Sequence, residues 1–218
     1  MSGVVEVGED GLARCPWALA PVEYRSYHDH EWGRPTGEDA RIYEKLCLEG
    51  FQSGLSWLTV LRKRAAFRKA FASFDPARVA EFNDIDVARL LSDISIIRHR
   101  GKIEATITNA RAVVALWSEG GSLAELFWSH EPRPGPAAVD LAELPAQTAE
   151  SKALSAQLRR RGFRFVGPTS VYAAMQSLGV VNDHLEGCCF RAEAAADRAA
   201  FTPPGAARAA PPRPASGR

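Results

Sequence analysis

Residues 103–121 read IEATITNARAVVALWSEGG, and the spacing of the apolar side chains in this stretch indicates the fold class. The apolar residues recur every three or four positions, at Ile103, Ile107, Ala110, Val114 and Trp117. This period predicts an amphipathic helix with one buried face. The glycine pair at 120–121 is expected to end it.

Helix signals continue on both sides of this stretch. Further helices are expected to start at Thr36, Ser56, Asp75, Asn83, Ser122, Ser151 and Pro168. Thr36 and Asp39 have the spacing of a capping box, and their helix should reach about Gly50. Residues 131–145 contain four prolines and are expected to form a long loop. Because we see no strand pair, internal repeat or Asn-Gly hairpin turn, the sequence predicts an all-α fold.

The composition is that of a soluble domain. The chain has 218 residues, of which 46% are hydrophobic and 24% charged. No apolar run approaches the ~18 residues of a membrane helix, and the N-terminus lacks the features of a signal peptide. We therefore expect a cytoplasmic protein with no membrane contact. The 27 basic and 26 acidic residues nearly balance, so any basic surface for nucleic acid must be local.

The two ends of the chain differ from the rest. Residues 192–218 contain eleven alanines, five prolines and one bulky apolar residue, Phe201. Such a segment has too little apolar surface to offset the entropy of ordering, so a disordered tail is expected. Residues 1–13 carry three acidic residues and no basic one, and are expected to form a flexible extension. One helical domain is then predicted over residues 14–191.

The connection GFRFVGP, residues 162–168, is a candidate phosphate-binding site. It follows three consecutive arginines, residues 159–161, and contains Arg164. Gly167 precedes a predicted helix N-terminus, where free N–H groups and the helix dipole favour a phosphate. The segment RHRGK, residues 98–102, is a weaker basic patch of the same kind. The alternative is an ordinary corner between two helices with a solvated arginine face.

Glu49 is a candidate functional acid. It follows Ile42 by seven residues, nearly two helical turns, and so shares the apolar face of its helix. A carboxylate on that face is costly unless it is bound to something. The alternative is that Glu49 lies at a frayed helix end and meets solvent.

Aromatic residues are concentrated close to Glu49 in the sequence, at Trp17, Tyr24, Tyr27, Trp32, Phe51 and Trp57. Packing in the core is the usual reason for such a cluster. The alternative is a pocket that stacks a flat ligand, because every nucleobase presents a π face to an aromatic ring.

Cysteine and histidine occur together at the two ends of the predicted domain. In VNDHLEGCCF, residues 181–190, three residues separate His184 from Cys188, a common spacing for two zinc ligands. The N-terminal end offers Cys15 and His28. Together these residues supply the four tetrahedral ligands that zinc requires. Two neighbours compete as ligands, Cys189 and His30, and buried cysteines with unrelated histidines are the alternative to a metal site.

Several segments together resemble the bacterial 3-methyladenine DNA glycosylase I family. They are RCPW, YRSYHDHEWG, LCLEGFQSGLSWLTVLRKR, IIRHRGKI, RRRGFRFVGPT and VNDHLEGCC. The resemblance covers roughly residues 14–190 and is specific, because the segments are long and occur in order. It implies a fold related to the helix-hairpin-helix glycosylases, with a structural zinc site that joins the N- and C-terminal segments.

The resemblance also implies the roles of individual residues. It implies a structural zinc ion on Cys15, His28, His184 and Cys188. It places Glu49 at the centre of a base pocket, with Tyr27, Trp57, Trp17, Tyr24 and Trp32 as its walls. It places DNA binding on the hairpin, at Gly162, Gly167, Thr169, Arg161 and Arg164.

The implied activity is excision of 3-methyladenine from double-stranded alkylated DNA by a monomer with no obligate protein partner. Related glycosylases have a catalytic aspartate where this chain has Asn182. Methylation at N3 makes adenine cationic and weakens its bond to the sugar, so we expect Glu49 to bind the base without a strong acid nearby. Asp183 is a secondary candidate, either to contact the helix end or to position the attacking water. Two alternatives are a zinc-stabilised DNA- or nucleotide-binding module without turnover and a hydrolytic metal centre with an open position.

Overall fold

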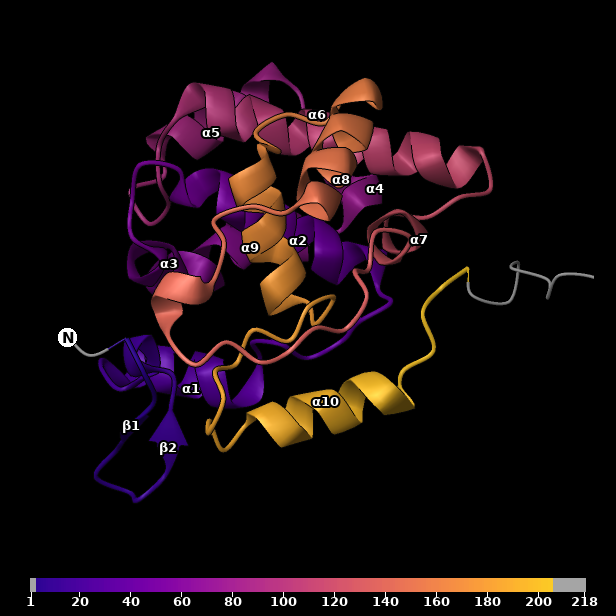
Figure 1. The fold of residues 1–218 in the computed structure, drawn as a ribbon. Coiled ribbons are helices and arrows are strands. Elements are labelled where there is room, and N and C mark those ends of the chain that lie inside the picture. The colour runs from indigo at the N-terminus through magenta and orange to yellow at the C-terminus, as the bar shows by residue number, and fades with distance from the viewer. Residues whose placement is uncertain (1–2, 206–218) are drawn as a thin grey trace, which may run out of the picture.

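Helix α2 (Asp39–Gln52) lies at the centre of the structure, and four other helices of the described chain pack against it (Figure 1). The computed structural model describes residues 3–205. In that range α2 packs against α3 (Trp57–Ala70), α6 (Arg100–Ser118), α7 (Leu123–Trp128) and α9 (Pro168–Ser177). The prediction of a mostly helical fold is confirmed. Within residues 3–205, no helix has both the length and the apolarity needed to cross a membrane.

The remaining helices cover the edges of this core. Helix α4 (Pro76–Ala80) and α5 (Asp84–Ser92) pack on α6, and α8 (Ala149–Arg160) packs on α9. Helix α1 (Val22–His30) packs on α3. Helix α10 (Arg191–Ala200) runs along the same side of the molecule as α1 (Figure 1). Three 3-10 turns complete the set, at Pro16–Ala18, Ala72–Phe74 and Leu141–Glu143.

Most predicted helix starts are confirmed by their caps. The side chains of Ser56, Asp75, Asn83 and Ser122 each accept backbone N–H groups of the helices that follow them. The prediction for α8 was two to three residues late, because Thr148 is the N-cap and Ser151 is its capping-box partner. The loop predicted over residues 131–145 is present, and the short turn Leu141–Glu143 interrupts it.

The capping box predicted from Thr36 and Asp39 is wrong. Glu38 is the N-cap of α2, and it makes no side-chain cap hydrogen bond. The Asp39 carboxylate instead accepts from the backbone N–H groups of Leu123 (3.0 Å) and Ala124 (2.8 Å) at the start of α7. A partner from another helix has outcompeted the local one, and Asp39 thereby joins α2 to α7.

The inward face of α6 also differs from the prediction at its C-terminal end. Ile103, Ile107 and Ala110 are buried as expected, but Trp117 is 40% exposed. Val113 and Leu116 are buried in the last turns. The end of α6 reaches beyond the helices that cover it (Figure 1), so the indole of Trp117 lies at the edge, where its Nε1 donates to Asp39 Oδ2 (2.5 Å).

The N-terminal segment contains a strand pair that the sequence did not predict. Glu6–Val7 (β1) pairs antiparallel with Ala13–Arg14 (β2). The turn between them has Gly11 at φ +77° and no Asn-Gly signal. The segment expected to be a flexible extension is therefore ordered over residues 3–13.

The C-terminal segment also differs from the expected disordered tail. Residues 191–200 form α10, since alanine is the best helix former. Arg34 pairs with Glu193 (3.0 Å) and Asp197 (2.5 Å) of this helix, and the ring of Phe201 lies 4.8 Å from that of Trp128. These few contacts hold the segment despite its low apolar content. The rest of the predicted tail, residues 206–218, lies outside the described residues.

Candidate active site and metal centre

The four predicted metal ligands come together in one buried cluster. The potential ligand atoms of Cys15, His28, His184 and Cys188 lie within 4.8 Å of one another. His184 Nδ1 is 3.2 Å from His28 Nε2, and Cys188 Sγ is 3.5 Å from His184 Nδ1 and 3.6 Å from His28 Nε2. Bonds of about 2.3 Å to sulfur and about 2.0–2.1 Å to nitrogen place tetrahedral neighbours about 3.3–3.8 Å apart. The arrangement therefore fits a tetrahedral ion held by two cysteines and two histidines.

The competing ligands are excluded by position. His30 and Cys189 are both exposed, whereas all four cluster residues are buried. His28 and His30 are two residues apart on α1, so their side chains point in different directions. Hydrogen bonds from Cys15 and then the two histidines hold the pKa of the Cys188 thiol well below its usual range, which favours the thiolate that binds metals.

A second set of residues orients the cluster histidines. Asp29 Oδ1 lies 2.8 Å from His28 Nδ1, and His184 Nε2 lies 3.3 Å from the carbonyl oxygen of Trp32. Arg14 is 2% exposed and donates to both oxygens of Asp29 at 2.8–3.0 Å. Outer contacts of this kind fix the ring orientation of metal-binding histidines. Sequence patterns gave no sign of Arg14 or Asp29, because neither is a ligand.

The predicted base-site residues also share one cavity, of about 340 Å³. Its walls include all six of them, Trp17, Tyr24, Tyr27, Trp32, Glu49 and Trp57. Trp17 contacts Trp32 and Tyr24 edge to face at 5.2 and 5.9 Å, and Tyr27 lies 5.4 Å from Trp57. A volume above about 300 Å³ is sufficient for a small planar ligand. Phe51, the other aromatic residue of the group, is fully packed in the core.

Glu49 lies inside the helix and not at a frayed end. Helix α2 continues to Gln52, and Glu49 is 5% exposed. The apolar-face argument is therefore correct, and the alternative of a solvent-exposed helix end is wrong. The carboxylate lies in the wall of the aromatic cavity. There it can accept hydrogen bonds from a ligand and can balance the positive charge of a cationic ligand.

Lys45 is the residue that sequence reasoning missed in this cavity. Its ammonium nitrogen lies 2.6 Å from Glu49 Oε1, 2.8 Å from the Tyr27 hydroxyl and 3.5 Å from the ring centroid of Trp57. Burial alone lowers the pKa of this lysine, but Glu49 and Tyr27 reverse the effect and the pKa is raised. Lys45 precedes Glu49 by four residues, and this i,i+4 spacing is the signal that identifies the pair.

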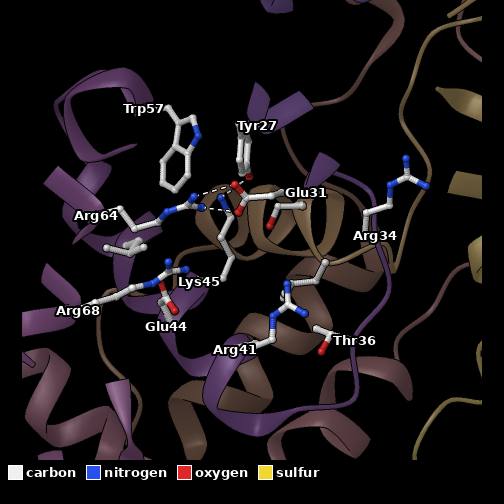
Figure 2. A pocket seen from close by; sticks show the side chains of 13 residues that line it. Tyr27, Glu31, Arg34, Thr36, Arg41, Glu44, Lys45, Trp57, Arg64 and Arg68 are labelled. Atoms are coloured by element: carbon white, nitrogen blue, oxygen red, sulfur yellow. Dashed lines mark hydrogen bonds and ion pairs between the residues drawn. The ribbon is translucent and has the colours of Figure 1, made fainter. Parts of the chain in front are cut away.

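The cavity adjoins a second, more polar one. Lys45, Tyr27 and Trp57 line both. The second cavity is lined by basic side chains from α2, α3 and the loop before α2, namely Arg34, Arg41, Arg64 and Arg68 (Figure 2). Glu31 pairs with Arg64 at 2.6 Å and Glu44 pairs with Arg68 at 2.7 Å. The indole Nε1 of Trp57 is buried between these cavities and has no hydrogen-bond acceptor among the described residues.

The predicted DNA-binding hairpin is the connection between α8 and α9. Phe163 and Val166 anchor it in the core, and Gly162 has φ +87°, which favours glycine. Asn109 of α6 donates to the carbonyl of Arg164 (3.1 Å) and accepts from its N–H (2.7 Å). These two hydrogen bonds fix the backbone of the hairpin against α6.

The side chains of the hairpin face outward. Arg164 and Thr169 are exposed, and Gly167 is the N-cap of α9. Arg161 is also exposed but pairs with Glu119 at 2.8 Å. The weaker patch at residues 98–102 is only partly basic surface, because the Lys102 ammonium is turned inward onto the carbonyl oxygens of Phe51 (2.9 Å) and Ser53 (2.6 Å).

Asn182 and Asp183 both have structural partners. Asn182 donates to the carbonyl of Arg191 (3.1 Å). Asp183 accepts from the Tyr172 hydroxyl (2.6 Å) and from the Gln176 amide (2.8 Å). Of these residues only Gln176 lines the aromatic cavity, so Asp183 orients a cavity residue and does not reach the cavity itself.

Known proteins are similar to this chain over most of its length. Residues 17–192 match the family model described as methyladenine glycosylase. DNA-3-methyladenine glycosylase 1 of Escherichia coli K12 is 47% identical over 181 residues, which cover 82% of this chain and 96% of that protein. DNA-3-methyladenine glycosylase of Haemophilus influenzae is 44% identical over 178 residues, covering 80% and 96%.

Solved structures agree with these sequence matches. A crystal structure of 3-methyladenine DNA glycosylase I superposes with a TM-score of 0.78 at 47% identity, covering 81% of this chain and 98% of the other. A variant of 3-methyladenine DNA glycosylase I in complex with 3-methyladenine superposes with a TM-score of 0.77 at 30% identity, covering 82% and 97%.

Proposed function

Since the chain belongs to the methyladenine glycosylase family, we propose that it turns 3-methyladenine out of alkylated DNA into the aromatic cavity and hydrolyses its N-glycosidic bond. The product is an abasic site, the first intermediate of base excision repair. One observation carries this proposal: a buried carboxylate, Glu49, in the wall of a cavity of about 340 Å³ whose other walls are aromatic rings.

The cavity supplies binding energy that is selective for the damaged base. Flipping a nucleotide costs a few kcal/mol, and stacking returns about 1–3 kcal/mol per base contact. Trp57 and its neighbours provide the rings. Glu49, as a carboxylate, accepts from the exocyclic amine and favours a cationic purine over a neutral one. Because alkylated adenine is already a good leaving group, recognition of this kind replaces the general acid that Asn182 does not supply.

The α8–α9 hairpin is the proposed DNA-binding element. It is a short connection between two helices with glycine at both ends, held by Asn109, and it leads into the N-terminus of α9, which supports its assignment as the hairpin of a helix-hairpin-helix motif. Gly162, Gly167 and Thr169 would contact a phosphate through backbone and hydroxyl groups, and Arg161 and Arg164 would add charge. Such contacts position the duplex and read no sequence.

Zinc is the proposed occupant of the cysteine–histidine cluster, and its role is structural. Two cysteines and two histidines match the ligands zinc prefers, and four protein ligands leave no open position for water. The ion would join the β2–α1 region to the segment before α10. Action as a cytoplasmic monomer without an obligate protein partner remains a prediction.

Two other functions make different predictions. A binding module without turnover would retain methylated DNA but release no base. A hydrolytic metal centre would lose activity on chelation with its fold preserved, whereas a structural site loses its fold. The aromatic cavity lies beside the cluster and not over an open ligand position, which favours the structural role.

The decisive experiment is incubation of the purified protein with methylated duplex DNA, followed by chromatography and mass spectrometry of the free bases. We expect 3-methyladenine to be released. Glu49→Gln should lower its release at least tenfold, with zinc content unchanged by elemental analysis. Release at the unaltered rate would remove Glu49 from the mechanism, and no release by the parent protein would contradict the proposed function.

A further inference from the structure

Lys45 places a positive charge inside the cavity proposed for a positively charged base. Its ammonium lies against Glu49, the Tyr27 hydroxyl and the face of Trp57. The ammonium lies 3.5 Å over one face of the Trp57 ring, so a base that stacks on Trp57 takes the other face, with its ring centre about 4.5–7 Å from the indole. Since Lys45 is 9% exposed, little water screens the two charges from each other.

The charges in the neighbouring cavity oppose movement of the Lys45 ammonium away from Glu49. Its lining residues include four arginines and only two acids, Glu31 and Glu44, both of which are already paired with arginines. Figure 2 shows the Lys45 side chain directed towards Tyr27 and Trp57, with Arg64 and Arg68 on one side and Arg41 and Arg34 on the other. Movement away from Glu49 would bring one cation towards several others. The ammonium is therefore held in the wall of the aromatic cavity.

We propose that Lys45 accelerates departure of the alkylated base by repelling it while it is cationic and ceasing to repel it once it is neutral. The inference rests on the proposed function and adds a residue to it. Glu49 draws the cationic base into the cavity, and Lys45 opposes its retention there. The pair thus provides recognition without the slow release that a lone buried carboxylate would cause.

The movement of positive charge during the reaction explains why repulsion from Lys45 would accelerate it. When the bond between the sugar C1′ and the base N9 breaks, its electron pair passes to the purine, and the base becomes neutral. The positive charge moves to the sugar, which then bonds to water and loses a proton to solvent. The charge therefore moves away from Lys45, and doubling the separation of two charges halves their repulsion. A repulsion that is weaker in the transition state than in the bound substrate lowers the barrier and raises the rate of the chemical step.

A charge-neutral variant tests the proposal by its kinetic signature. Under single-turnover conditions on methylated duplex, Lys45→Met should lower the rate at saturating protein about tenfold and also lower the half-saturating concentration about tenfold. Lys45→Arg retains the charge and should keep the parent rate within about threefold. Lys69→Met is the matched control, because Lys69 is exposed on α3 and lines neither cavity.

A binding measurement separates this inference from the proposed function. The permanent cation 3,9-dimethyladeninium and neutral 3-methyladenine at pH 8 are titrated into each protein and followed by tryptophan fluorescence. Lys45→Met should bind the cation about tenfold more tightly and the neutral base within about threefold of the parent. If the parent protein excises no base, the proposed function fails, and these titrations still decide the role of Lys45.

Two results would overturn the role of Lys45. The first is an unaltered single-turnover rate in Lys45→Met, or a lower rate with an equal or higher half-saturating concentration. The second is an equal change in affinity for the two purines. Circular dichroism checks that the variant is folded at the assay temperature, and Lys45→Gln takes its place if it is not.

Discussion

The ion pair between Lys45 and Glu49 predicts strong energetic coupling between the two positions. The charged atoms are 2.6 Å apart, and the side chains are 11% and 5% exposed. At an effective dielectric constant near 20, the attraction at this distance is about 6 kcal/mol, and desolvation of both ions cancels much of it. Removing one partner leaves the other buried and unpaired, which costs about 3–5 kcal/mol in a fully enclosed site. Because this pair lines an open cavity, we expect about 2 kcal/mol for each single variant, Glu49→Gln and Lys45→Met.

The double variant should be far less damaged than the sum of the single ones. Replacing both members of a buried pair by neutral groups is often nearly neutral, so we expect a loss of about 1 kcal/mol and a coupling energy of about 3 kcal/mol. In a chain of this size, each kcal/mol shifts the midpoint of thermal unfolding by about 2–4 °C. Calorimetry at fixed zinc concentration should give a fall of about 4–8 °C for each single variant and about 2–4 °C for the double variant. Additive losses would show that the two side chains do not interact in solution, and would also remove the basis for the role assigned to Lys45.

Three further predictions concern the metal, the cavity and the hairpin. Asp29→Asn should lower zinc affinity about 10–100-fold in competition with a chelator, because it removes the carboxylate on His28 Nδ1; equal affinity would mean that Asp29 does not orient the ligand. Trp57→Ala should weaken 3-methyladenine binding by about 1–3 kcal/mol in calorimetric titration, and full retention would place the base elsewhere. Arg164→Gln should weaken binding to all duplexes alike and reduce the slope of log affinity against log salt by about 1; a sequence-dependent loss would contradict its assignment to phosphate.

The sequence predicted those features of the fold that depend on local patterns. Ser56, Asp75, Asn83 and Ser122 act as caps because their partners are only two or three residues away. Asp39 was misassigned because its partners, at the start of α7, are more than eighty residues away. The ordering of α10 was missed for the same reason, since it depends on distant contacts such as the ion pairs of Arg34.

The sequence predicted most residues of the site, but it did not predict the positive charge that Lys45 places beside Glu49. Residue type and spacing suggested Glu49 and the four cluster ligands, with His30 and Cys189 left as competitors, and the aromatic content around residues 17–57 suggested the cavity walls. The choice between His28 and His30 depended on helix direction, which the spacing left open. Lys45 was missed because a lysine in a helix is usually a solvated residue, and only the packing of Tyr27 and Trp57 shows that it is enclosed.

The ring of His28 connects the cysteine–histidine cluster to the wall of the aromatic cavity. It is part of the cysteine–histidine cluster, and it packs against Trp17 at 5.1 Å and Trp32 at 6.1 Å, two walls of the aromatic cavity. A ligand or ion that restricts the motion of this imidazole therefore also restricts the motion of both indole rings. By thermodynamic reciprocity, an occupant of the cavity would raise the affinity of the cluster for its proposed ion by the same factor as the ion raises the affinity for the occupant. The proposed zinc site would therefore do more than join two distant segments of the chain, because its affinity for the metal would depend on whether a base fills the cavity.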